Sequence, residues 1–307
     1  MSTGINPFCY PLPPVPPQAF TRLPEAAAIR DLAEVAADHY GAVSAQHVVP
    51  APGTQILLPV IAALLPPGRA MVLGPTYGEY ARVALMAGHS VEEVSMLEQL
   101  AEADLAIVVN PNNPDGRVVT KQALRALAEA LGRRDALLVV DETFMDVLAE
   151  DASLAAEVVG GNIVVLRSIG KFFGLPGLRL GFAIAPPAIT ARLSAWLGPW
   201  AVSGPAISVG EIALADHAWI ETTRGCLARL AARLDDLLAC SQLQVIGGTS
   251  LFRLVRTTHA SDLFHHLGEA GILVRSFDAQ RTWLRFGLPG DESAWARLHE
   301  ALTNFRA

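Results

Sequence analysis

Short, wholly apolar runs alternate with amphipathic segments through most of residues 25–190. Leu105 to Val109 and Leu137 to Val140 contain no polar side chain, whereas Lys121 to Leu131 repeats leucine every three or four positions. Apolar runs of this length indicate strands buried on both faces, and the intervening period indicates helices. The pattern predicts a mainly parallel sheet covered by helices on both faces. We expect further strands at Val48 to Val49, Ala70 to Leu73, Val91 to Val94, Ile163 to Leu166 and Phe182 to Ala185, and further helices over Glu25 to Tyr40, Ile56 to Leu65 and Glu79 to Ala87.

After residue 190 the pattern becomes mixed. Trp196 to Pro205 is aromatic and contains glycine and proline, and Ser208 to Leu238 has the character of one long helical region. Strands and helices then follow without strict alternation, which is typical of a smaller α+β domain. We expect strands over Ser250 to Val255, near Ile272 to Arg275 and over Trp283 to Gly287, and helices over Ala260 to Ala270 and Asp291 to Phe305.

The first 24 residues carry seven prolines, which exclude a helix and favour an extended chain. This segment also contains large apolar side chains, among them Phe8, Tyr10 and Phe20, which are uncommon in a solvated tail. We therefore expect it to pack on the rest of the protein rather than to be disordered. The chain therefore divides into an N-terminal segment that packs with the small domain (1–24), a large domain (25–205) and a small C-terminal domain (206–307).

Composition excludes several classes of protein. At 307 residues, 51% hydrophobic and 17% charged, the chain can bury a large core. A formal net charge of −7 without a basic block argues against a nucleic-acid partner. No run reaches the roughly 18 apolar residues of a membrane span, and the first residues lack the basic start and apolar core of a signal peptide. Cys9, Cys226 and Cys240 are widely separated, so we expect free thiols, no metal site and a cytoplasmic location.

Polar side chains follow the predicted strands where each one ends. Tyr77, Asn113 and Asp141 come shortly after three of the strands, and Ser168 with Lys171 follows a fourth. In parallel sheets the ligand lies beyond the carboxyl ends of the strands, so we expect these side chains to meet there. Each has a structural alternative as well: Tyr77 as a core aromatic, Asn113 as an Asx-turn before a proline, and Asp141 as a satisfied buried carboxylate.

Lys171 lies between two apolar runs, in a stretch from Ser168 to Gly181 that contains four glycines. A lysine in such surroundings can have its pKa lowered and can form a Schiff base with an aldehyde. Pyridoxal 5'-phosphate (PLP) supplies an aldehyde, and Ser168 and Arg179 offer a hydroxyl and a guanidinium to its phosphate. The alternative is a glycine-rich connection with a surface lysine. Gly53, Thr54 and Gln55 precede an apolar helix whose free N–H groups would suit an anion, although many helices begin this way.

Three motifs occur in an order that resembles fold-type I PLP enzymes. They are Asn-Pro-Asn-Asn-Pro from Asn110, Asp-Glu-Thr-Phe from Asp141, and the stretch from Ser168 to Gly181 with its Ser-x-x-Lys and Gly-x-Arg-x-Gly spacing. The chain resembles the class I/II aminotransferase family over nearly its whole length. The resemblance implies PLP as cofactor, an α/β large domain with a mainly parallel seven-stranded sheet flanked by helices, a small α+β domain, and a homodimer with active sites at the subunit interface.

The resemblance also implies a role for each motif. Lys171 would carry the cofactor and act as acid and base, and Asp141 would pair with the protonated pyridine nitrogen. Asn113 would bond the phenolate oxygen, and Tyr77 would stack on the ring. The residues implied for the cofactor phosphate are Gly53, Thr54, Gln55, Ser168 and Arg179.

A second set of residues is implied for a phosphorylated amino-acid substrate. Arg285, in an apolar run, matches the late arginine that clamps the α-carboxylate. The segment containing Asn6 resembles the N-terminal segment that folds over the substrate in these enzymes. Arg22, Arg275 and Arg117 are candidates for the substrate phosphate.

Departures from the common family pattern narrow the expected reaction. Asp115 replaces a threonine, and Phe144 and Leu23 replace tyrosines. With its other motifs, the chain resembles the threonine-phosphate decarboxylases of cobalamin biosynthesis, which implies conversion of L-threonine O-3-phosphate to (R)-1-amino-2-propanol O-phosphate. The alternative is a histidinol-phosphate-like aminotransferase. A ligand-sensing PLP domain of a transcription regulator is a third reading, but it would need a DNA-binding domain, for which the residues before Gly4 offer no room.

Overall fold

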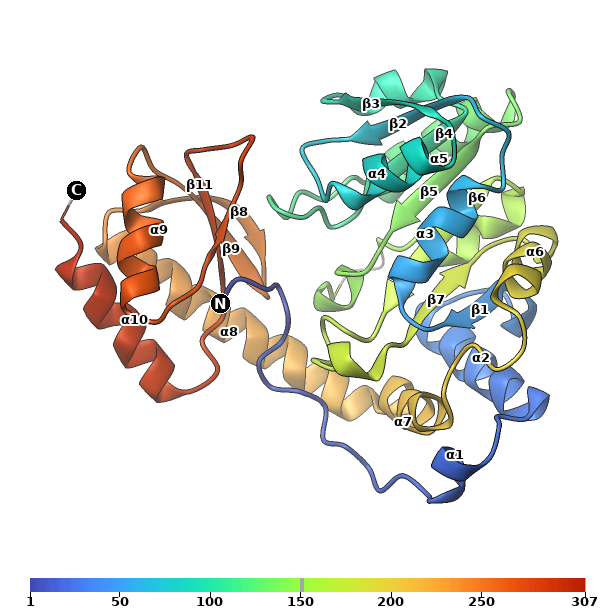
Figure 1. Ribbon diagram of the computed structural model, residues 1–307, viewed down its shortest axis with the longest axis horizontal. Helices are drawn as coiled ribbons and strands as arrows, with labels where there is room; N and C mark the ends of the chain where they lie inside the picture. The colour runs from blue at the N-terminus through green and yellow to red at the C-terminus, as the bar shows by residue number, and fades with distance from the viewer. Residues whose placement is uncertain (150–151, 307) are drawn as a thin grey trace.

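The computed structural model describes residues 1–149 and 152–306, and these form two sheets (Figure 1). The larger sheet has seven strands in the order β1-β7-β6-β5-β4-β2-β3 among the described residues. β7 is antiparallel to β1 and β6, and the other neighbours are parallel. The strands are β1 (Val48–Ala51), β2 (Arg69–Leu73), β3 (Ser90–Val94), β4 (Leu105–Val109), β5 (Leu137–Asp141), β6 (Ile163–Ser168) and β7 (Gly181–Ile184). The prediction of a mainly parallel seven-stranded sheet is confirmed.

Helices cover both faces of this sheet, as the wholly apolar strands predict. In β4, Leu105, Ile107 and Val109 pack in the cluster that contains α3, α4 and α6, whereas Ala106 and Val108 pack in the cluster with α2 and α5. Each strand therefore buries both of its faces. The helices are α2 (Ala26–Tyr40), α3 (Thr54–Ala62), α4 (Glu79–Met86), α5 (Lys121–Gly132) and α6 (Pro187–Leu197), with short 3-10 turns η1 (Ala45–His47), η2 (Leu97–Glu102), η3 (Met145–Val147), η4 (Ala155–Gly160) and η5 (Pro176–Leu178).

The smaller sheet is antiparallel, with the order β10-β11-β9-β8 in the described part of the chain. Its strands are β8 (Gln244–Thr249), β9 (Phe252–Arg256), β10 (Arg275–Ser276) and β11 (Trp283–Gly287), and α9 (Ala260–Glu269) and α10 (Glu292–Asn304) complete this part of the molecule. The sequence pattern misses β8. Gly247 and Gly248 lie inside that strand, and they remove the apolar alternation by which a strand is recognised.

The long helical region expected over Ser208 to Leu238 is two helices. α7 (Gly204–Ala215) and α8 (His217–Cys240) meet at Asp216, whose carboxylate accepts a hydrogen bond of 3.0 Å from the backbone N–H of Trp219. That bond caps the start of α8. α8 then runs from the large sheet to the small one, as Figure 1 shows.

The N-terminal segment is extended over most of its length and is packed on the protein rather than free. The backbone N–H of Tyr10 donates to the Phe173 carbonyl at 2.8 Å, and that of Asn6 donates to the Lys171 carbonyl at 3.0 Å. The expected absence of a helix is wrong at one place: α1 (Gln18–Thr21) forms a single turn. It begins directly after Pro17, a position where the missing proline N–H costs nothing.

Candidate active site

A cavity of about 570 Å³ lies where the carboxyl ends of the central parallel strands meet the N-terminal segment and the small sheet. Its position is the one expected from the polar residues at the strand ends. The walls include every residue that the sequence suggested for the cofactor: Gly53, Thr54, Gln55, Tyr77, Asn113, Asp141, Ser168, Lys171 and Arg179. Arg275 and Arg285 line the same cavity from the small sheet.

Lys171 extends into the cavity from the segment that follows β6. Its Nζ lies 5.7 Å from the centre of the Phe144 ring, and within the described residues it forms neither a hydrogen bond nor an ion pair. Burial lowers the pKa of Lys171, and the positive charges of Arg285 and Arg179 lower it further against the opposing effect of Asp141. A lowered pKa favours the neutral amine, which is the nucleophilic form.

Asp141 ends β5 and is buried, and each of its carboxylate oxygens accepts one hydrogen bond. The backbone N–H of Thr143 donates to Oδ1 at 2.7 Å, and the hydroxyl of Tyr80 donates to Oδ2. Tyr80 was not predicted to belong to the site. Its place three residues after Tyr77, at the start of α4, is a signal that could have found it.

The first turn of α3 and Arg179 form a cup for an anion. Gly53, the residue before α3, has φ of 86°, and a Cβ there would lie 2.7 Å from a guanidinium nitrogen of Arg179. Only glycine therefore allows this close approach. Arg179 donates to the Pro176 carbonyl at 3.2 Å and has no carboxylate partner in the part of the chain that is described. Free N–H groups, a helix dipole and an unneutralised guanidinium together suit a phosphate.

Two further predicted residues of the cup contribute in different ways. Ser168 lies at the end of β6, and its Oγ accepts a hydrogen bond of 3.1 Å from the Gly170 N–H, so its hydroxyl hydrogen is available to a ligand. The side chain of Gln55 instead donates to Glu79 at 2.8 Å. Gln55 therefore offers an anion its backbone N–H rather than its amide.

Arg285 lies in β11 with its guanidinium in the cavity. Nη2 donates to the Ser2 carbonyl at 2.6 Å, Nη1 donates to Oδ1 of Asn113, and the Phe252 ring centre lies 5.1 Å from the guanidinium carbon. Burial lowers the pKa of Arg285 to about 10, with a contribution from Arg275. A buried cation whose described hydrogen-bond partners are neutral is suited to receive an anionic ligand. The bond from Arg285 occupies Oδ1 of Asn113 and leaves the Nδ2 group as a donor to a ligand.

Tyr77 is not the core aromatic that the alternative interpretation offered. Its side chain is 45% exposed and lines the cavity, and its ring meets that of Tyr80 edge to face at 5.9 Å. Burial raises the pKa of Tyr77, and the charge of Glu79 adds to that effect, while Arg275 opposes it. Tyr77 and Arg275 therefore lie close enough to interact across the cavity mouth.

Three of the residues suggested for the substrate lie elsewhere. The Asn6 amide donates to the Phe172 carbonyl at 2.8 Å, so this side chain braces the lysine segment instead of lining the cavity. Arg117 donates to the carbonyls of Leu73 and Gly74 and pairs with Asp115 at 3.3 Å. Arg22 is exposed after α1, away from the cavity walls.

A buried ionic network lies behind the site and was not predicted. Arg167 pairs with Glu142 at 3.0 Å and with Asp146, and His39 approaches Asp146 at 3.3 Å. Burial raises the pKa of Glu142, and the charge of Arg167 opposes that rise. Because residues alternate along β6, Arg167 faces the side opposite to Ser168.

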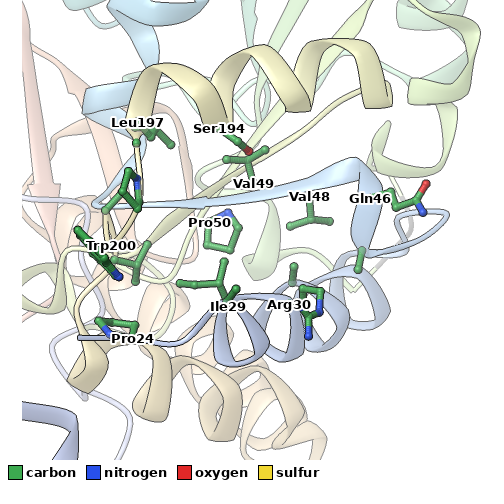
Figure 2. Close-up of a pocket in the computed structure, with 17 residues that line it drawn as sticks. Pro24, Ile29, Arg30, Gln46, Val48, Val49, Pro50, Ser194, Leu197 and Trp200 are labelled. Carbon is green, nitrogen blue, oxygen red and sulfur yellow. The ribbon is translucent and has the colours of Figure 1, made fainter. Parts of the chain in front are cut away.

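A second cavity, of about 390 Å³, is apolar and lies apart from these residues. Figure 2 shows it between α2 and α6, with Ile29, Pro50 and Trp200 around it. Arg30, at one side, is the one charged side chain among its described lining residues.

Other kinds of site are not found in the described ranges. No group of three or more His, Cys, Asp or Glu side chains in residues 1–149 and 152–306 is arranged to hold a metal ion. Over the same residues, no helix combines the length and the apolar character needed to cross a membrane.

Comparison with known proteins agrees with the geometry. The family model "Aminotransferase class I and II" matches residues 17–302. A threonine-phosphate decarboxylase of Sinorhizobium sp is 45% identical over 98% of this chain and 90% of its own length, and one of Pseudomonas aeruginosa is 41% identical over 100% and 91%. The crystal structure of L-threonine-O-3-phosphate decarboxylase from Porphyromonas gingivalis superposes with a TM-score of 0.79 at 24% identity, over 94% of this chain and 91% of that one. The chain belongs to the aminotransferase class I and II family.

Proposed function

We propose that this chain is a PLP-dependent decarboxylase that converts L-threonine O-3-phosphate to (R)-1-amino-2-propanol O-phosphate and CO₂ in cobalamin biosynthesis. The observation that carries the proposal is the full-length identity of 41–45% to two proteins named threonine-phosphate decarboxylase. The cavity supports it independently, because it combines a nucleophilic lysine, a buried carboxylate and unneutralised arginines.

The residues present fit PLP. The space above Gly53 that a Cβ would fill, beside Arg179, suits the cofactor phosphate, and Lys171 and Asp141 lie in the same cavity. Bound PLP supplies an aldehyde that joins the lysine amine and a ring that accepts the electron pair left when a bond to the substrate Cα breaks. Phe144 has no hydroxyl, so Nδ2 of Asn113 is the donor that we assign to the phenolate oxygen.

Three side chains of this protein then have separate roles in the proposed reaction. The Asp141 carboxylate holds a proton on the ring nitrogen, because an anion there favours the cationic ring. Lys171, once released, holds the proton that is returned to Cα after CO₂ leaves. Arg285 clamps the α-carboxylate in a bidentate contact, for which the Ser2 carbonyl has to give way. The bond that breaks is the one perpendicular to the ring, so this clamp decides between loss of CO₂ and loss of the Cα proton.

Arg275 is the residue that we assign to the substrate phosphate. It lines the cavity beside Tyr77 and influences the pKa of Arg285. Arg117 is a weaker candidate because its donors are already occupied by backbone carbonyls. Arg22 stays a prediction that would need a second copy of the chain, since it lies outside the cavity of its own chain.

We also propose a homodimer. Phe20, Leu23, Trp196 and Trp200 are each more than half exposed, and Trp200 lines the apolar cavity of Figure 2. Large exposed apolar side chains are typical of a protein interface. Light scattering of the purified protein should give twice the mass of the chain, and Trp200→Glu should shift it toward the monomer.

The division into segments and the location remain proposals as well. The N-terminal segment (1–24) bonds to the lysine segment, which supports a role over the active site. α7 packs on α2, which supports a boundary between the large and small domains near Asp216 rather than at residue 205. The three cysteines are free, which supports a reducing compartment such as the cytoplasm.

The reaction is tested by its products. Purified protein with PLP and L-threonine O-3-phosphate should release CO₂ and the amino-alcohol phosphate in equal amounts, without 2-oxoglutarate. Formation of glutamate that depends on 2-oxoglutarate would instead support the aminotransferase alternative.

A further inference from the structure

Tyr80 occupies an unusual position in the cavity wall. It lies in the first turn of α4, is 3% exposed, and donates its hydroxyl hydrogen to Oδ2 of Asp141. The backbone N–H of Thr143 donates to Oδ1 at 2.7 Å. Asp141 is therefore held by one backbone donor and one side-chain donor, and only the second can be removed by substitution.

The hydrogen bond satisfies one oxygen of the buried Asp141 carboxylate. Burial penalises a carboxylate, and each donor to its oxygens offsets part of that penalty. Burial raises the pKa of Tyr80 well above its ordinary value, and the charge of Asp141 raises it further. A raised pKa favours the protonated hydroxyl, which is the form that donates to Asp141.

Tyr77 lies just before α4, and Tyr80 lies in the first turn of that helix. Tyr77 and Tyr80 are three residues apart, and their rings meet at 5.9 Å with an interplanar angle of 84°. Tyr77 is exposed to the cavity, where a ring would stack, whereas the Tyr80 hydroxyl is committed to the carboxylate. The start of α4 therefore sets the position of the stacking ring relative to Asp141.

We propose that Tyr80 is a positioning residue that holds the Asp141 carboxylate aimed at the ring nitrogen of the bound cofactor. The inference rests on the proposed use of PLP. It adds a residue that acts through Asp141 rather than on the substrate.

The test uses holoenzyme loaded with PLP that carries ¹⁵N in the ring. In Tyr80→Phe the ¹⁵N signal should move from the protonated position toward the unprotonated one, part of the way to its position in Asp141→Asn. The dissociation constant for PLP should rise about tenfold, as for the loss of a hydrogen bond to a charged group. kcat should fall while KM for the substrate changes little, because the substrate contacts remain.

The chain provides a matched control. Tyr10 also donates to an aspartate, Asp216, at 3.0 Å, but outside the cavity. Tyr10→Phe should leave the ¹⁵N signal and the PLP affinity unchanged. Tyr80→Phe added to Asp141→Asn should produce no further movement of the signal, because its effect passes through the carboxylate.

Distinct outcomes separate this inference from the proposed function. If wild-type protein takes up no PLP, both are overturned. If it loads normally and Tyr80→Phe leaves the ¹⁵N signal and the affinity unchanged, the inference alone is wrong, and a lowered melting temperature would then mark Tyr80 as structural. Should Tyr80→Phe not fold, Tyr80→His keeps a ring donor. With that variant the signal should stay at the protonated position, and a signal at the unprotonated position would overturn the inference.

Discussion

At the carboxyl ends of β5 and β6, the two faces of the large sheet differ in how their charged side chains are paired. On the face away from the cavity, Glu142 and Arg167 pair at 3.0 Å, and Asp146 adds a second carboxylate to the guanidinium. On the other face, their neighbours Asp141 and Ser168 open into the cavity. A shift of one residue along each strand thus separates a closed ionic network from an open site.

The cavity differs from the ionic network because its cationic side chains have no carboxylate partner among the described residues. Lys171, Arg179 and Arg285 form no ion pair with a carboxylate among the described residues, and the hydrogen-bond acceptors given for the two arginines are neutral oxygens. Paired buried charges offset each other's desolvation cost, whereas a buried cation without an anion, such as Arg285, is costly unless a ligand supplies the negative charge. Arg179 is exposed and Lys171 only partly buried, so the cost falls mainly on Arg285. The comparison shows which charged residues belong to the site and which support it.

The largest effect is expected from Lys171→Ala. Activity should fall by about 10,000-fold, the upper range for a lost acid–base group, and the near-visible absorbance of bound PLP should disappear. The chain has one other lysine, Lys121, which pairs with Glu157 at 3.6 Å outside the cavity. Lys121→Ala should change neither quantity, and borohydride reduction followed by mass spectrometry should locate the cofactor on Lys171. Cofactor absorbance that survives in Lys171→Ala would refute the site.

Arg285→Leu should have the next largest effect. It should lower kcat/KM about 100-fold, mainly through KM, because it removes the charged contact to the carboxylate. Arg253 in β9 serves as the control because, unlike Arg285, it is paired with a carboxylate: it donates to Asp235 at 2.5 Å. Arg253→Leu should lower the melting temperature and leave KM unchanged. Equal changes of KM in the two variants would remove the distinction between paired and unpaired arginines.

Arg167→Met tests the opposite face. It should lower the free energy of unfolding by about 3 kcal/mol, since it leaves Glu142 and Asp146 as uncompensated buried carboxylates. Denaturant titration measures this loss. KM for the substrate should stay close to that of the wild type when folded protein is assayed, and a KM as high as that of Arg285→Leu would place Arg167 in the site.

The smallest effect concerns pH. The neutral amine of Lys171 captures the aldehyde, and its population grows as pH rises through the amine pKa. Because burial, Arg285 and Arg179 lower that pKa, PLP capture by the apoprotein should speed up with pH around a midpoint below the ordinary lysine value of 10.5. Stopped-flow absorbance measures the midpoint. Arg285→Leu should raise it, because one of the lowering charges is gone, whereas a midpoint of 10.5 in the wild type would contradict the described environment.

Local patterns were enough to predict which strand-end side chains meet in the cavity. Asp141, Ser168 and Lys171 lie at the ends of wholly apolar strands, and the carboxyl ends of parallel strands share one edge. Tyr80 and Arg167 were missed because each reads as part of a regular element, and only the distance to a distant carboxylate gives it a role. Asn6 was misplaced for the same reason, since its motif does not tell which way its side chain points.

The sequence by itself determined the alternation of strands and helices, because burial on both faces of a strand requires an uninterrupted apolar run. That alternation also determined the sheet edge at which the polar side chains of the cavity lie. Only the tertiary structure decided which other parts of the chain contribute residues to the cavity at that edge. Arg285 meets Asn113 and Ser2 from sequence positions 172 and 283 residues away. Such contacts depend on how the small sheet and the N-terminal segment pack on the large sheet, and neither packing leaves a periodic pattern along the chain.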